Sequence, residues 1–271
     1  VRLTVVSSEG CIDFTEDTIV IHPQPVAAFT TNQACTRQNV QFTNQSSCDS
    51  LSTITQYFWN FGDFSSGSNT STLTNPTHQY DTTLNYSASL ITVTNFGCSD
   101  TAFKTVRVNQ TPTVQFTYSP TCFGDLMEFF NPGSAIDSLY LWNFGDGQTN
   151  QLKEPAHYYI SATNYTVTLT VTSTRGCVAS AQRQVAVSPL PVASFATPAG
   201  CLGPPYTLTD ASTVSSVSIT AFEWNILEPN VNLSGPNVNY TFSDTGNYHV
   251  TLRVTSDIGC QKSVTKVVGL H

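Results

Sequence analysis

Apolar and polar residues alternate along most of this chain, in short runs that recur at a nearly constant interval. Four related runs end in Gly-Cys: VRLTVVSSEGC, ASLITVTNFGC, VTLTVTSTRGC and VTLRVTSDIGC. Their cysteines lie at intervals of 87, 79 and 83 residues, at Cys11, Cys98, Cys177 and Cys260. Alternation with a period of two, rich in Val, Thr, Ile and Phe and broken by Gly, Asn and Pro, predicts β-strands. We therefore predict an all-β protein.

Two further markers share this period. The three tryptophans, Trp59, Trp142 and Trp224, lie 83 and 82 residues apart, and each unit opens with a Pro-x-x-x-Phe sequence. About seven short strands in roughly 80 residues are typical of an Ig-like β-sandwich. We therefore predict tandem sandwiches arranged head to tail. The expected boundaries are 1–23 for the last two strands of a preceding module, then 24–110, 111–189 and 190–271 for three complete modules.

The residues around each tryptophan raise the question of a catalytic loop. FWNFGD at 58–63 and LWNFGD at 141–146 end in Gly-Asp, whereas EWNILE at 223–228 does not. A catalytic carboxylate normally needs a partner, and no second acid recurs with these aspartates. A phosphate loop needs a Gly-rich stretch that opens a helix. We therefore predict no catalytic residue and a structural turn, in which Gly supplies a permissive backbone and Asp bonds the turn amides. Its residues are Trp59, Gly62, Asp63, Trp142, Gly145, Asp146 and Trp224.

These residues resemble the PKD (polycystic kidney disease-type) family of Ig-like domains. In the second module WNFGDG, EPAHYY and NYTVTLTV match the family along the whole unit. The first module departs at Phe64, where a second Gly is usual, and the third keeps only Trp224, Tyr240, Gly246 and Tyr248. A remodelled central turn is therefore expected in the third module. Arrays of this kind resemble large secreted adhesins and gliding-motility surface proteins of Bacteroidota, which implies spacer and adhesive roles without catalysis.

Composition bears on compartment and partners. Charged residues make up only 10% of the chain, the net charge is −8, and there are ten Lys and Arg residues. Nucleic acid and anionic membrane surfaces are poor partners for such a chain. The sequence contains no run of 18 apolar residues, so we predict no membrane-spanning segment in it. Eight cysteines without a CxxC motif indicate an oxidising compartment, so we expect a secreted, extracellular or cell-surface protein.

Each complete module carries one cysteine just after its first strand and one in its last hairpin. In an Ig-like sandwich these positions lie at opposite ends, and a strand of six to eight residues spans roughly 20–27 Å. Disulfide Cα atoms must lie within about 7 Å of each other. In a head-to-tail array, however, the first loop of one module faces the last hairpin of the next. The expected bonds therefore cross module boundaries.

The predicted pairs are Cys35–Cys177, Cys122–Cys260 and, inside the first module, Cys48–Cys98, with Cys11 and Cys201 bonded to modules outside the chain. Pairing within each module remains the alternative, as Cys35–Cys98, Cys122–Cys177 and Cys201–Cys260. Bonds that cross the boundaries predict a stiff rod, and closed modules predict a flexible string.

Two histidines and five Asp-Ser/Thr sequences are candidate metal and glycosylation sites. His78 and His157 each lie two residues after a Pro, and a solitary His favours a hydrogen-bonded structural role over a metal ligand. Calcium occurs in some PKD-like modules but needs grouped oxygen ligands, and acids are sparse here, so no cofactor is expected. Asp-Ser/Thr followed by an apolar residue or Thr resembles the O-glycosylation motif of Bacteroidota. It occurs at Thr18, Ser50, Thr82, Thr101 and Ser138.

Two functions fit these features. The first is a structural or adhesive segment of a large secreted cell-surface protein, forming an extended, disulfide-braced stalk or filament. Its partners would be neighbouring modules, surface polysaccharide or protein, or laterally associated copies. The alternative is a non-catalytic spacer or binding region of a secreted polysaccharide- or protein-degrading enzyme. That alternative predicts an exposed aromatic row, for which Tyr57, Tyr140 and Phe222 are candidates.

Overall fold

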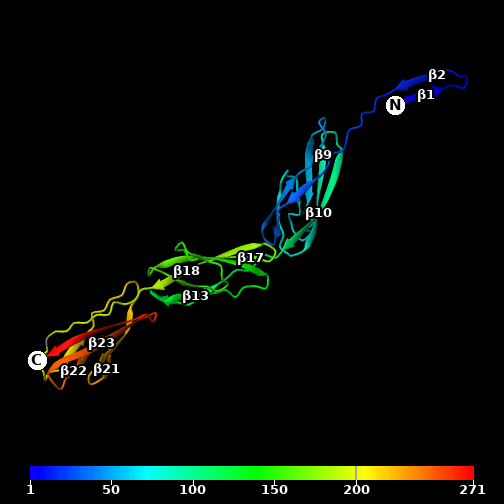
Figure 1. Ribbon diagram of the computed structural model, residues 1–271. Helices are drawn as coiled ribbons and strands as arrows, with labels where there is room; N and C mark the ends of the chain where they lie inside the picture. The colour runs from blue at the N-terminus through cyan, green and yellow to red at the C-terminus, as the bar shows by residue number, and fades with distance from the viewer. Residues whose placement is uncertain (199) are drawn as a thin grey trace. The chain divides into compact units, whose positions relative to one another are not determined.

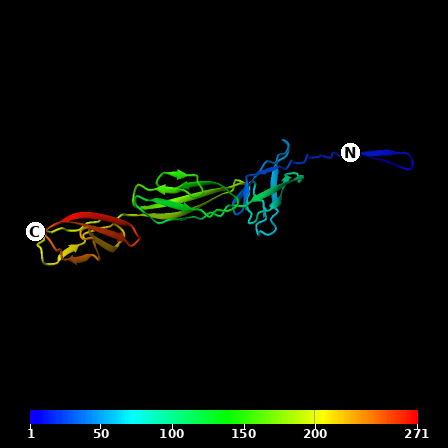
Figure 2. The ribbon, with the colours of Figure 1, turned by 60° about the horizontal axis from the view of Figure 1, so that its bottom comes forward.

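The residues that the structure describes form three β-sandwiches and one β-hairpin. The computed structural model describes residues 1–198 and 200–271, and every named element in these ranges is a strand (Figure 1). No helix in this part of the chain could cross a membrane. Figures 1 and 2 show the strands of these sandwiches from two directions. Each sandwich has its own core, built around Trp59, Trp142 or Trp224. The predicted all-β fold with tandem Ig-like sandwiches is confirmed.

The first repeat consists of eight strands in two sheets. Their bounds are β3 Phe29–Thr31, β4 Ala34–Cys35, β5 Asn39–Asn44, β6 Ile54–Asn60, β7 Thr70–Ser71, β8 Thr77–Gln79, β9 Asn85–Thr94 and β10 Ser99–Asn109. One sheet has the order β3-β5-β8 and the other β4-β10-β9-β6-β7. The short strand β4 pairs in parallel with the end of β10, where Cys35 lies opposite Asn109. This pairing places the first-loop cysteine at the end of the repeat's last strand.

The second repeat has the same plan. Its strands are β11 Thr117–Tyr118, β12 Thr121–Cys122, β13 Leu126–Phe130, β14 Asp137–Asn143, β15 Thr149–Asn150, β16 Ala156–Tyr158, β17 Asn164–Ser173 and β18 Val178–Ser188. The sheets have the orders β11-β13-β16 and β12-β18-β17-β14-β15. Cys122 lies opposite Ser188 in the parallel pair, as Cys35 lies opposite Asn109. Equal topology explains the period of the sequence.

The third repeat keeps the plan but changes its central turn. Its strands are β19 Tyr206–Thr209, β20 Ile219–Ile226, β21 Val231–Ser234, β22 Asn237–Tyr240, β23 Gly246–Ser256 and β24 Gln261–Leu270, in sheets β19-β22 and β21-β20-β23-β24. Leu227 occupies the position of Gly145, and its amide donates to the carbonyl oxygen of His249. Pairing therefore continues to Ile226 opposite Val231, which makes a longer hairpin than in the other repeats.

The first sixteen residues form a hairpin of their own. Strand β1 (Arg2–Val6) pairs antiparallel with β2 (Ile12–Glu16), and these two strands make a two-stranded sheet. Every residue of the hairpin is exposed. Its alternating apolar side chains therefore lack the second layer that covers the equivalent strands of the complete repeats.

By compactness the chain divides into two units. One consists of Val1–Pro112 together with Ser173–Cys177, and the other of Thr113–Thr172 together with Val178–His271. The turn between β17 and β18 thus groups with the first unit, although it belongs to the second repeat by sequence.

The Asn-Tyr sequence near the start of the long strand of each repeat fixes that strand to the segment before it. The hydroxyl groups of Tyr86, Tyr165 and Tyr248 donate to the carbonyl oxygens of Thr82, Ser161 and Asp244. This is the tyrosine corner of Ig-like sandwiches.

Candidate functional site: the repeated turn and the cysteines

The Gly-Asp turn is held by close backbone packing. The amide of Gly145 donates to Asn143 Oδ1 at 2.9 Å, and the backbone of Gly145 has φ +83°. A Cβ atom on Gly145 would lie 2.6 Å from the carbonyl oxygen of Thr166, and one on Gly62 would lie 2.5 Å from that of Ser87. Both the positive φ and the approach of the neighbouring strand therefore require glycine.

The aspartate that follows this glycine bonds to a histidine. Asp146 Oδ2 lies 2.7 Å from His157 Nε2, and Asp63 Oδ2 lies 3.2 Å from His78 Nε2. The imidazole of His157 stacks on Phe144 with ring centroids 3.9 Å apart. Because each aspartate and histidine is buried or nearly so, the pair is shielded from solvent. The arrangement links the turn to the neighbouring sheet rather than presenting a proton-transfer group to a substrate.

The electrostatics of this pair also favour a structural role. Burial by itself would raise the pKa of the Asp146 carboxyl, but hydrogen bonds from His157 and from the amide of Gln148 outweigh it and lower that pKa. Burial and the nearby negative charge of Asp146 raise the pKa of Tyr159. The neutral Tyr159 hydroxyl donates to the carbonyl oxygen of Phe144 at 3.1 Å. These bonds join the turn after β14 to β16 and to the residue that follows β16.

Sequence reasoning missed the Asp–His contact, because it sought only a second acid as the partner of each aspartate. The sequence does contain a signal for this contact, because the third repeat lacks both the aspartate and the histidine. In the third repeat Glu228 stands in the position of Asp146, and Val238 stands opposite Leu208 as His157 stands opposite Met127. The pair is therefore present or absent as a unit.

Two disulfides join cysteines of different repeats. Cys35 bonds to Cys177 with 5.8 Å between Cα atoms, and Cys122 bonds to Cys260 with 5.7 Å. Both distances lie in the ordinary range for a disulfide. Each bond connects the first loop of one repeat with the last hairpin of the next. None of the pairs proposed within single modules occurs among these two bonds.

The expected bond between Cys48 and Cys98 does not form in the structure. Both residues are free cysteines, as are Cys11 and Cys201, which are exposed. The thiol of Cys48 lies in its own loop, with Sγ 3.1 Å from the carbonyl oxygen of Ser52. The thiol of Cys98 lies 3.7 Å from the carbonyl oxygen of His22. The prediction of this pair was wrong because the two thiols have different neighbours, although they share one end of the repeat.

The remaining candidate positions lie on exposed surface or against the three cores. The five possible O-glycosylation positions, Thr18, Ser50, Thr82, Thr101 and Ser138, are all exposed, and glycosylation stays a prediction. Within residues 1–198 and 200–271, no three or more His, Cys, Asp or Glu side chains group as metal ligands would. The aromatic candidates Tyr57, Tyr140 and Phe222 are half-buried and pack against the three cores. These three aromatic residues therefore do not form an exposed row.

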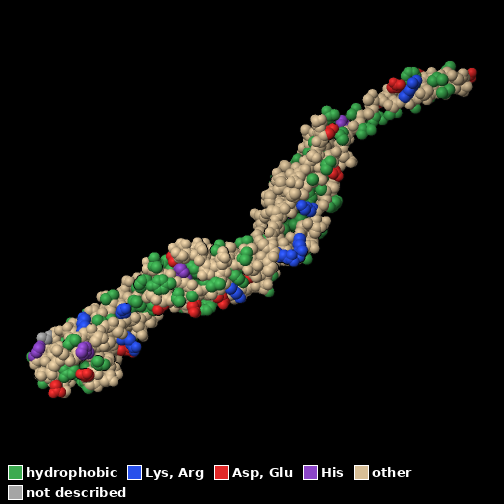
Figure 3. All heavy atoms as spheres, viewed as in Figure 1, with side chains coloured by type: hydrophobic (Ala, Val, Ile, Leu, Met, Phe, Trp, Pro, Cys, Tyr) green, Lys and Arg blue, Asp and Glu red, His purple; other side chains and the backbone are tan. Residues whose placement is uncertain are grey.

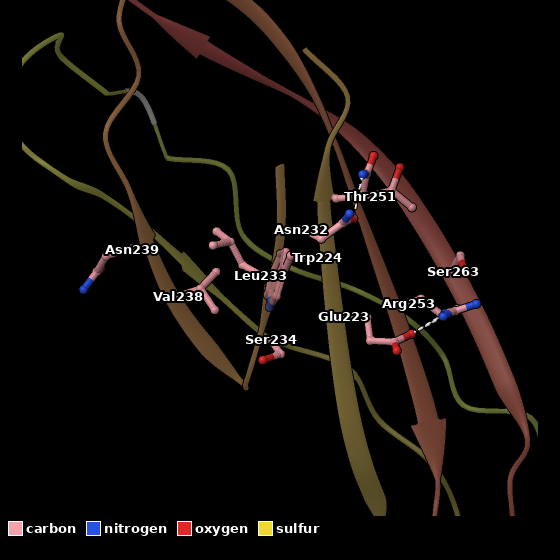
Figure 4. Close-up of a pocket in the computed structure, with 11 residues that line it drawn as sticks. Glu223, Trp224, Asn232, Leu233, Ser234, Val238, Asn239, Thr251, Arg253 and Ser263 are labelled. Atoms are coloured by element: carbon pink, nitrogen blue, oxygen red, sulfur yellow. Dashed lines mark hydrogen bonds and ion pairs between the residues drawn. The ribbon is translucent and has the colours of Figure 1, made fainter. Parts of the chain in front are cut away.

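One hollow lies on the third repeat, where side chains from β20, β21 and β23 converge (Figure 4). The Arg253 guanidinium donates to the Glu223 carboxylate. The side-chain amide of Asn225 donates to the Asn232 side chain at 2.8 Å and to that of Asn230 at 3.0 Å. Because its main polar groups already bond one another, the hollow resembles a satisfied surface more than a ligand site.

A family model for the PKD domain matches residues 22–110, 109–188 and 188–270. The chain belongs to the PKD domain family. Pre-pro-metalloprotease PrtV of Vibrio cholerae is 33% identical over 48% of this chain and 14% of that protein, and collagenase ColA of Bacillus cereus is 33% identical over 38% and 11%. The matches thus span only a small part of these relatives.

Solved PKD domains match single repeats. The PKD1 domain of the Vibrio cholerae metalloprotease PrtV is 31% identical, covering 28% of this chain and 96% of that one, with a TM-score of 0.27. The PKD1 domain of Vibrio anguillarum Epp is 30% identical, covering 29% and 95%, with a TM-score of 0.28. The relatives PrtV and ColA are named as a metalloprotease and a collagenase, whereas the resemblance to Bacteroidota adhesins stays a prediction.

Proposed function

We propose that this chain is a non-catalytic segment of a secreted protein, in which PKD modules bind an extracellular polymer and hold it near other parts of that protein. The observation that carries the proposal is the match of all three repeats to the PKD family, together with relatives named as a metalloprotease and a collagenase. A non-catalytic role is supported by the repeated turn, because its aspartates bond to histidines of the same repeat instead of facing solvent. Two disulfides suit an oxidising, extracellular setting.

A surface for such binding lies on the outer face of the five-stranded sheet of the first repeat. Phe58 of β6 lies opposite Ile91 of β9, and both are exposed. Phe103 of β10, on the other side of β9, exposes 73% of its surface. Charged side chains are few on the face shown in Figure 3. Exposed aromatic and aliphatic side chains among uncharged polar ones suit a sugar or protein polymer better than a charged partner.

Co-sedimentation of the chain with insoluble collagen, cellulose and chitin tests this function. Binding to at least one polymer is expected, and the double variant Phe58→Ala/Phe103→Ala should weaken it. Phe64→Ala is the matched control, because Phe64 is also an exposed phenylalanine of this repeat but lies in the turn after β6. Retention no greater than that of an unrelated protein on every polymer would refute the binding role.

The disulfides favour a second candidate, a braced stalk. Each joins the last hairpin of one repeat to the first loop of the repeat before it. In repeat arrays stability comes from the modules and from the contacts of nearest neighbours. A covalent bond between neighbours would limit how far such an array extends under load when a module unfolds. Failure to bind any polymer, together with the force response predicted below, would favour the stalk.

A further inference from the structure

Cys98 differs from the other two hairpin cysteines of the complete repeats because it is free. Cys177 and Cys260 occupy the same position and each bonds the first-loop cysteine of the preceding repeat. Cys98 has no such partner within residues 1–198 and 200–271. Its two repeat equivalents thus show what chemistry this position supports.

A second regularity places the first-loop cysteine in each repeat. The residue eleven positions after a hairpin cysteine ends the last strand in the first two repeats and directly follows it in the third. Its carbonyl oxygen accepts a hydrogen bond from the backbone amide of the residue that follows the first-loop cysteine. These bonds join Thr36 to Asn109 at 2.9 Å, Phe123 to Ser188 at 2.8 Å and Leu202 to His271 at 3.2 Å. The end of the last strand therefore marks where the first-loop cysteine lies.

The hairpin at residues 1–16 carries the same signature. His22 lies eleven residues after Cys11, and its carbonyl oxygen is the group that lies 3.7 Å from Cys98 Sγ. The imidazole of His22 stacks on Phe96 with ring centroids 3.6 Å apart. Cys98 therefore lies beside the position at which the first-loop cysteine of another sandwich would pair.

An independent observation comes from the apolar face of this segment. By the 87-residue offset, Leu3 corresponds to Leu90 and Ile21 to Val108. Leu90 and Val108 are buried in the core of the first repeat, whereas Leu3 exposes 63% and Ile21 exposes 87% of their surface. Residues 1–22 thus present the core-facing side of a sandwich without the second sheet that covers it.

We propose that residues 1–22 close a further PKD-type sandwich and that the first-loop cysteine of that sandwich forms a disulfide with Cys98. A second copy of this chain does not fit the position, because each of its three sandwiches already contains its own closing strands. The two thiols lose two electrons and two protons to a disulfide oxidant such as oxidised glutathione, which is reduced to two thiols. This bond is independent of the polymer-binding role proposed above.

A fusion supplies the missing strands from this chain itself. Val167–Cys177 of the second repeat corresponds to Val1–Cys11. A second copy of residues 111–166, placed directly before Val1, therefore supplies the strands that residues 1–22 lack, and the two segments together make one sandwich. Asp125→Ser in the added copy, at an exposed position, gives its cysteine peptide a distinct mass. After expression in an oxidising compartment, non-reducing peptide mapping by mass spectrometry should find the added copy's Cys122 bonded to Cys98.

Two variants of the fusion provide controls. Cys98→Ser should leave the added cysteine as a free thiol, whereas Cys48→Ser should leave the new bond intact. A Cys48–Cys98 bond in the fusion would overturn the proposal. A free Cys98 beside an added sandwich whose amides are protected from hydrogen exchange would overturn it as well.

A variant of the unfused chain keeps the test decisive if the added sandwich does not fold. His22→Cys puts a thiol at the residue whose carbonyl oxygen lies 3.7 Å from Cys98 Sγ. This variant should form a bond between positions 22 and 98 in oxidised glutathione. Pairing of Cys98 with Cys48 or with Cys201 of another copy would refute the placement on which the proposal depends.

Discussion

Replacing Gly145 by alanine tests whether the close approach of two strands dictates the repeated turn. Gly145 has φ +83°, and a Cβ atom there would lie 2.6 Å from the carbonyl oxygen of Thr166. Gly147, two residues later, has φ +93° and nothing within 4 Å of its Cβ position. Both substitutions strain the backbone, but only one of them also forces two segments apart. Gly147→Ala is therefore a matched control.

The expected magnitudes follow from these two effects. A non-glycine residue in the left-handed region costs about 1–2 kcal/mol, so Gly147→Ala should destabilise the second repeat by that amount. The contact with Thr166 adds about 1–3 kcal/mol, typical of overpacking, because the oxygen belongs to the backbone of a strand paired with β18. Gly145→Ala should therefore cost about 2–5 kcal/mol.

Hydrogen exchange of β17, followed by mass spectrometry in the whole chain, measures this difference locally. At about 1.4 kcal/mol per factor of ten, the amides of β17 should exchange about 5- to 150-fold faster in Gly145→Ala than in Gly147→Ala. Exchange in the third repeat should not change. Equal rates in the two variants would refute the argument, since the steric contact would then contribute nothing.

The aspartate of the repeated turn, the tyrosine corner and the two disulfides each give a further prediction. Hydrogen bonds lower the pKa of Asp146 in the folded state, so its carboxylate stabilises the second repeat fully above the ordinary pKa of about 3.9, and this stabilisation is lost as the pH falls through the lower folded-state pKa. Asp146→Asn should abolish this pH dependence and lower the free energy of unfolding at neutral pH by about 1–3 kcal/mol. Urea unfolding followed by nuclear magnetic resonance from pH 2 to 7 measures both effects. Tyr165→Phe should destabilise the second repeat by about 1 kcal/mol, seen in the same titration, and no change would refute the corner bond. Pulled from its ends, the oxidised chain should extend to only about 360 Å, since the shortest path through the two bridges holds roughly 100 residues: about 34 before Cys35, about 55 from Cys177 back to Cys122 and about 11 after Cys260. Reduction should lengthen the fully extended chain to about 970 Å in force spectroscopy, a gain of about 610 Å. Cys98→Ser should leave the oxidised length unchanged. If the pairs were closed within modules, the same variant would lose the Cys35–Cys98 bond and lengthen the oxidised chain by about 230 Å.

Much of the fold could be predicted because the information is local. In β9 the alternating pattern places Tyr86, Ala88 and Leu90 on the buried side, as a period of two requires. The Pro-x-x-x-Phe and Trp markers predicted three cores, and the structure has one around each Trp. A strand's buried side depends on its own residues, so sequence alone determines it.

The partners of polar and sulfur groups depend on contacts between distant segments. His157 reaches Asp146 only because β16 lies across the sandwich from the turn. Cys48 and Cys98 occupy the same end of the first repeat, which made their pairing plausible, but a thiol bonds only where geometry brings another sulfur within reach. By itself, then, the sequence determined the repeat, its strands and their buried sides, because periodicity is written into neighbouring residues. Only the tertiary structure decided which histidine meets which aspartate and which thiol remains free, because those contacts exist only once strands far apart in the chain have been assembled.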